Sequence, residues 1–245
     1  IRDLVRSRGL GDVYKRQVLS GGSPFEISTP FLEAELFDIK FAQSADVMYL
    51  CHPNHDIRKL SRTGHTNWTL ATVSFTQTSS LTISGANNRP SCVSFFEQRL
   101  VFAGTDTEPQ TLFFSKSGDY ENMDANIGGT VADDDAIIYT IASNQVNAIR
   151  FMTATRTLII GTAGGEFTVS GGSVDTAITP TNILIKKQSN HGAANVDAIA
   201  VGNATLFLQR AKRKIRELAY NFDTDGYTAP DLTILADHIS ESGLI

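Results

Sequence analysis

The sequence predicts an all-β protein, a β-propeller-like array of small antiparallel sheets with about four blades visible. Charged residues are 19% of the 245-residue chain, below the roughly 25% typical of soluble domains. Short apolar runs, each followed by a turn, recur with a period of about 50 residues, which is the signature of propeller blades. An ordinary β-sandwich also has evenly spaced short strands, and it stands as the alternative.

Each repeat is expected to hold at least three strands. They are 39–41, 47–50 and 57–61 in the first repeat, 91–96, 100–103 and 111–115 in the second, 146–151, 158–161 and 166–170 in the third, and 196–201, 206–209 and 215–220 in the fourth. A further strand is expected at 136–141. Such a sheet has two apolar faces and buries them by stacking on its neighbours.

Two short helical turns are expected beside these strands. Thr29-Pro30 resembles an N-cap followed by proline at the first helical position, which predicts a turn that continues to Leu36. Residues 235–239 could form another single turn.

Residues 1–17 are basic and show neither strand nor helix periodicity. Their end, Asp12-Val13-Tyr14-Lys15-Arg16-Gln17, matches what a common transposon-end sequencing adaptor encodes in one reading frame. We interpret 1–17 as a sequencing-adaptor artefact and expect it to be disordered; a basic targeting segment is the alternative. The propeller-like domain is assigned to 18–245. We expect it to be truncated at the C-terminus, so that its ring of blades is incomplete.

Charge and cysteine content exclude some classes of function. The net charge of −5 argues against a general nucleic-acid binder that is held by phosphate neutralisation. Two cysteines cannot form a disulfide framework, which favours synthesis in a reducing compartment. No apolar run approaches the ~18 residues that a membrane span needs.

Candidate metal and catalytic motifs are weak. Cys51, His52 and His55 are close in sequence, but zinc sites need three or four convergent ligands, and a second ligand pair is missing. We therefore expect a polar hairpin tip beside a buried cysteine. The run 133–135 could offer carboxylates to a hard cation, although a charged start to the following strand is expected. Without a nucleophile elbow, H-E-x-x-H or Walker loop, we expect no catalytic, cofactor-binding or metal residues and no enzyme activity.

One basic cluster is the candidate subunit interface. It consists of Arg210, Lys212, Arg213, Lys214 and Arg216, between the strands 206–209 and 215–220. A solvated hairpin loop is the plain interpretation. A contact with an acidic neighbouring subunit or with nucleic acid is the functional one.

Several long sequence segments resemble one protein family. They are 37–50, 52–53, 58–60, 95–104, 117–120, 133–136, 147–150, 179–182, 225–227 and 231–232. Together they resemble the N-terminal half of a family of bacteriophage tail proteins. The family comprises the nozzle (tail tubular protein B) and packaged-DNA-stabilisation proteins of short-tailed phages.

The resemblance implies a structural subunit that forms a homo-oligomeric ring around the DNA exit channel of the tail. Its expected partners are other copies, other tail proteins, the portal or adaptor, and double-stranded DNA that passes without sequence-specific binding. It implies a virion protein made in the bacterial cytoplasm, with no catalytic residues to transfer.

Two alternatives from other classes stand beside the tail subunit. A carbohydrate- or receptor-binding propeller predicts recurring exposed aromatic residues, whereas the chain has one tryptophan, Trp68. A propeller hydrolase predicts carboxylates and a histidine that converge at the central channel.

Overall fold

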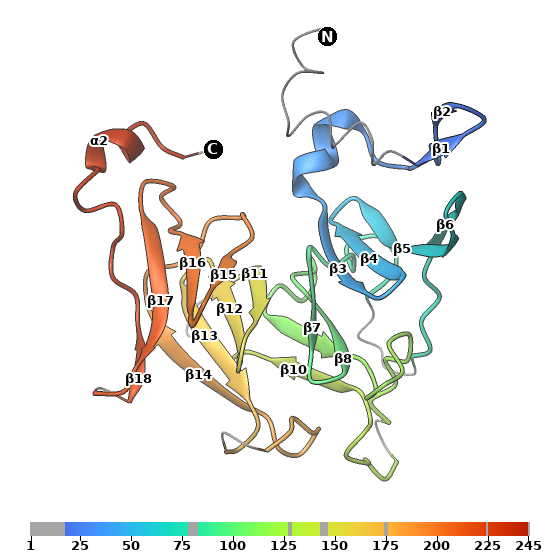
Figure 1. Cartoon of the computed structure of the whole chain (residues 1–245). Coiled ribbons are helices and arrows are strands. Elements are labelled where there is room, and N and C mark those ends of the chain that lie inside the picture. The colour runs from blue at the N-terminus through green and yellow to red at the C-terminus, as the bar shows by residue number, and fades with distance from the viewer. Residues whose placement is uncertain are drawn as a thin grey trace, which may run out of the picture.

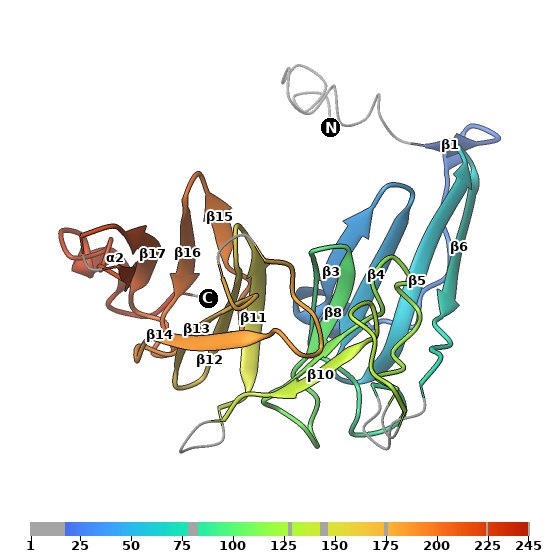
Figure 2. The same cartoon turned by 90° about the horizontal axis from the view of Figure 1, so that it is seen from below.

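The protein is an all-β, propeller-like array of small antiparallel sheets, as predicted. The computed structural model describes residues 18–77, 83–126, 129–142, 147–173, 176–223 and 225–244. Within these ranges the strands form four four-stranded antiparallel sheets and one two-stranded hairpin. The four sheets follow one another in chain order along an open arc (Figures 1 and 2). Residues 1–17, interpreted above as an adaptor artefact, lie outside the described residues.

In every four-stranded sheet the strands pair in the order of the chain, which is the meander of a propeller blade. The first sheet holds β3 (Lys40–Ser44), β4 (Val47–His52), β5 (His55–Gly64) and β6 (Asn67–Thr72). The second holds β7 (Cys92–Phe96), β8 (Arg99–Ala103), β9 (Thr111–Phe114) and β10 (Ile137–Thr140). The third holds β11 (Ile149–Ala154), β12 (Leu158–Thr162), β13 (Gly165–Ser170) and β14 (Leu184–Ser189). The fourth holds β15 (Ile199–Val201), β16 (Ala204–Leu208), β17 (Ile215–Asn221) and β18 (Gly226–Thr228).

Short elements flank the sheets at both ends. The hairpin of β1 (Leu19–Ser20) and β2 (Ser23–Pro24) and the 3-10 helix η1 (Glu33–Asp38) precede the first sheet, and α2 (Asp237–Ser240) follows the fourth. Among the described residues, no helix is long and apolar enough to cross a bilayer.

Strand alternation explains why the sheets stack. On β8, Leu100 and Phe102 pack into a core cluster with residues of the first sheet. Their neighbours Val101 and Ala103 pack into a different cluster with residues of the third sheet. Because successive side chains of a strand point to opposite faces, one buried strand supplies two cores.

The third and fourth sheets repeat this arrangement. On β12, Leu158 and Ile160 face the second sheet, whereas Ile159 belongs to the cluster that contains Phe207 of the fourth sheet. In the part of the chain that the structure describes, three separate apolar cores therefore lie between four sheets, one at each junction. A sandwich of two sheets would have one core between its layers, so the alternative prediction is wrong.

The expected inner strands agree with the structure, and so does β10, the outermost strand of the second sheet, which was expected at 136–141. The outermost strands of the other three sheets were missed. β6, β14 and β18 have mostly exposed or half-buried side chains and lack a continuous apolar run. An outer strand of a blade has few apolar residues because less of it lies between neighbouring sheets, so pattern reading finds it poorly.

The first helical turn begins later than predicted. η1 starts after Leu32, not at Thr29. The Leu32 backbone N–H donates to the Glu35 carboxylate (2.9 Å), and the Glu35 N–H donates to the Leu32 carbonyl (3.0 Å). These two bonds satisfy the groups at the helix start. The predicted second turn at 235–239 corresponds to α2.

Candidate functional site

The basic cluster lies on the connection between β16 and β17, and its five members do not share one role. Arg210, Lys212 and Arg213 are exposed, whereas Lys214 and Arg216 are partly buried. The loop closes through the Gln209 N–H, which donates to the Lys214 carbonyl (2.9 Å), and Lys212 has a left-handed φ of 58°.

Lys214 and Arg216 are bound to groups of the same chain. Lys214 Nζ lies 2.6 Å from Asp231 Oδ2. Arg216 donates to Gln209 Oε1 (2.9 Å) and to the Ala229 carbonyl (2.7 Å). These bonds fasten the segment after β18 to the fourth sheet. An interface at this loop would therefore use Arg210, Lys212 and Arg213.

The Lys214–Asp231 pair predicts a pH dependence of stability. Hydrogen bonds lower the pKa of Asp231 from 3.8 to about 2, and the bond from Lys214 has a larger effect than the bond from Thr233. A carboxylate with a depressed folded-state pKa stabilises the fold above its unfolded pKa, and this contribution is lost as the pH falls through the folded value. We expect the difference in unfolding free energy between the wild type and Asp231→Asn to shrink as the pH falls from about 4 towards 2. Urea unfolding across this range measures it.

A control shows whether this loss is specific to Asp231. Asp106 is exposed on a loop of the second sheet. An Asp106→Asn variant should track the wild type across the same pH range. A constant gap for Asp231→Asn would contradict the prediction.

Both ends of the sheet array expose apolar side chains. On β3, Phe41 is 62% exposed, and it lies on the face opposite to Ala42, which packs towards the second sheet. On β15, Ile199 (65%) and Val201 are exposed and pair with Leu206 and Ala204, on the face away from the third sheet. The segment after β18 adds exposed apolar residues, Leu232, Ile234, Leu235 and Ile239. Large exposed apolar patches are typical of interaction sites, whereas single exposed apolar side chains are common on monomers.

The first strands of the sheets converge on a buried lysine. Lys40 of β3 has 8% of its side chain exposed, and its Nζ lies 3.2 Å from Asp197 Oδ1, just before β15. The same Nζ contacts the Arg150 carbonyl and the Cys92 thiol. Lys40 thus joins all four sheets where their first strands meet.

Residues 133–135 are held in place by basic side chains on and beside the second sheet. Arg99 of β8 is buried, and its guanidinium donates to the carbonyls of Asp133 (2.8 Å), Asp135 (2.7 Å) and Ser115 (2.8 Å). Lys116 Nζ lies 3.0 Å from the Asp134 carboxylate and 3.4 Å from that of Asp135. This segment is fastened before β10 begins, in agreement with its interpretation as a charged start of the strand.

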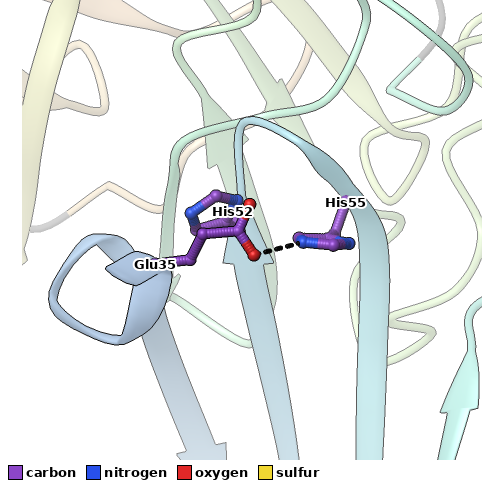
Figure 3. Close-up of side chains that lie close together, drawn as sticks. All are labelled: Glu35, His52 and His55. Atoms are coloured by element: carbon purple, nitrogen blue, oxygen red, sulfur yellow. Dashed lines mark hydrogen bonds and ion pairs between the residues drawn. The ribbon is translucent and has the colours of Figure 1, made fainter. Parts of the chain in front are cut away.

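The structure gathers Glu35, His52 and His55, one potential ligand atom from each lying within 4.8 Å of the others (Figure 3). Glu35 comes from η1, and the histidines flank the β4–β5 turn. Cys51, which the sequence places beside the histidines, is instead fully buried in the core between the first and second sheets.

Hydrogen bonds hold the Glu35 carboxylate in place. Oε2 accepts from the Leu32 N–H and lies 2.7 Å from His55 Nε2, and Oε1 accepts from Asn54 Nδ2 (3.1 Å). These hydrogen bonds lower the pKa of Glu35 from 4.5 to about 2, and the bond from the Leu32 N–H has the largest effect. No signal in the sequence places Glu35 here, because its position depends on how the chain before β3 folds back.

Comparisons with known proteins add a distant likeness. No family model and no curated protein matches the chain. A crystal structure of a protein from Lactobacillus plantarum, determined by structural genomics, is similar with a TM-score of 0.43 and 14% sequence identity. The match covers 78% of this chain and 54% of that protein, so this chain spans about half of its length. The likeness carries no argument about function.

Proposed function

We propose that this chain is a structural subunit of a bacteriophage tail, in the nozzle or tail tube, that assembles with other copies into a ring around the DNA exit channel. The structural observation that supports the proposal is the exposed apolar surface at both ends of the array, on β3 and on β15. Heterologous contacts between copies would bury such surface and close into rings when the rotation fits. The resemblance of long sequence segments to tail nozzle proteins is the reason for proposing a phage tail as the assembly.

The DNA channel of this proposal runs between copies. Lys40, Cys92 and Asp197 fill the place where the first strands of one chain meet, so the path must lie outside the sheet array. An acidic chain suits a conduit, because a basic wall would bind the phosphates and slow the passage of DNA. A strongly basic lumen in an assembled ring would contradict this part of the proposal.

The basic loop supplies the test of assembly. We expect the triple reversal Arg210→Glu, Lys212→Glu and Arg213→Glu to leave the fold intact, because all three side chains are exposed and the bond from Arg210 Nη1 to the Ala163 carbonyl is long (3.4 Å) and exposed. It should shift the assembled species towards the monomer, since repulsive charges at an interface oppose association. Sedimentation velocity at matched concentrations measures the shift.

The matched control is Lys186→Glu, on an exposed position of β14 outside the loop. It should sediment like the wild type. If the triple variant also assembles like the wild type, the loop is not an interface. If the wild type itself remains a monomer at high concentration, the ring proposal fails.

A further inference from the structure

We propose that Glu35, His52 and His55 form a binding site for a divalent transition-metal ion of the zinc class. Two imidazole nitrogens and one carboxylate oxygen, with an open fourth position, are a donor set that zinc takes in proteins. Three residues from three elements, η1, β4 and β5, bring their ligand atoms together at the tip of the first sheet.

His52 provides an observation that is independent of the cluster. Its side chain is buried, with 2% of the residue exposed, and its Nε2 has no hydrogen-bond partner among the described residues. A buried polar atom without a partner is costly and rare in folded proteins. A metal ion bound through Nε2 would provide the missing partner for this nitrogen.

Hydrogen bonds from outside the cluster hold the carboxylate donor in place. The Leu32 N–H donates to Glu35 Oε2, and Asn54 Nδ2 donates to Oε1. Such outer hydrogen bonds orient metal ligands and strengthen binding.

An aromatic ring lies beside the cluster, which is open enough for an ion to enter. The Phe31 ring lies edge-on to His55, with centroids 5.1 Å apart, and 6.1 Å from the His52 ring. The side chains of Glu35 and His55 are 15% and 20% exposed, so solvent reaches the site from their side. A water molecule could therefore occupy the fourth position.

Metal binding requires three local changes. Ligands of a tetrahedral zinc ion lie about 3.4 Å apart, so the Glu35–His55 contact of 2.7 Å opens slightly. His55 gives up the proton between it and Glu35. His52 Nδ1 accepts from the Asn54 N–H (3.1 Å), and ligation gives up this bond in either case: through Nδ1 the ion takes the place of the N–H, and through Nε2 the imidazole proton moves to Nδ1. The site would then clamp η1 onto the β4–β5 turn.

The test is titration of the tag-free, EDTA-treated chain with Zn²⁺ by calorimetry, and with Co²⁺ by visible absorption. We expect one ion per chain, the absorption of a four-coordinate Co²⁺ complex, and a rise in melting temperature with Zn²⁺. Glu35→Gln and His55→Asn should each weaken the affinity by at least 10–100-fold and remove the Zn²⁺-dependent rise. His52 is left unchanged in these variants, because replacing a buried residue would also destabilise the metal-free fold.

Two control variants separate this site from surface binding. Glu33→Gln lies on the same helix and His65→Asn on the β5–β6 turn, both exposed and outside the cluster. They should bind Zn²⁺ like the wild type. Absence of stoichiometric binding, or equal affinity in Glu35→Gln and the wild type, would overturn the proposal. Each variant is compared with and without metal, so a change in the stability of the metal-free fold does not affect the conclusion.

Discussion

Replacing Phe102 by alanine should lower the free energy of unfolding by about 3–5 kcal/mol. Phe102 is fully buried on β8 and packs in the core between the first and second sheets, where the Phe75 ring lies edge-on at 5.5 Å. Its removal leaves a cavity that the strands on both sides cannot fill without moving. Guanidinium unfolding should show a lower midpoint with an unchanged slope.

The control is a phenylalanine of equal size outside the cores. Phe222 is 86% exposed after β17, and Phe222→Ala should change stability by no more than about 0.5 kcal/mol. Equal losses in the two variants would mean that Phe102 does not occupy an inter-sheet core, and would contradict the stacked-sheet architecture.

Replacing Gly161 by alanine should cost about 1–3 kcal/mol, because the ring of Phe151 leaves no room for a Cβ there. A Cβ at this β12 position would lie 2.0 Å from Cε1 of Phe151. The Phe151 ring packs over the glycine into the core with Phe207, with ring centroids 5.9 Å apart. Strand β11 is irregular between Ile149 and Phe151, so the fit already depends on local backbone geometry.

Gly64→Ala on β5 is the matched control, because its nearest atom, Asn67 Cβ, would lie at an ordinary 3.5 Å. We expect a small effect there. A double-mutant cycle adds a second test: in a Phe151→Ala background, Gly161→Ala should cost much less than in the wild type. Additive losses would show that the ring and the glycine do not interact.

Much of the fold could be predicted from the sequence, for a physical reason. Strands such as β8 and β12 lie between two sheets, so both of their faces are apolar and they are conspicuous as runs. β14 has Lys186 and Lys187 exposed in its middle and gives no such run. The repeat of about 50 residues is the spacing between equivalent inner strands of successive sheets. The repeat could therefore be found although most outer strands were not recognised.

The candidate sites were less predictable because they depend on partners distant in sequence. The loop position of the basic cluster follows from its flanking strands. That Lys214 pairs with Asp231 follows only from how the chain returns after β18. Likewise, His52 and His55 are adjacent to a turn that the sequence indicates, but Glu35 reaches them from a helix that begins later than its proline suggests.

Electron microscopy of the purified chain tests the central claim most directly, namely that the end sheets of the array are built to contact other copies. We predict closed rings of uniform size with an axial hole between the copies. The sample is examined at concentrations well above those of the sedimentation experiment. If the particles are then separate and each has the mass of one chain, the ring proposal is contradicted.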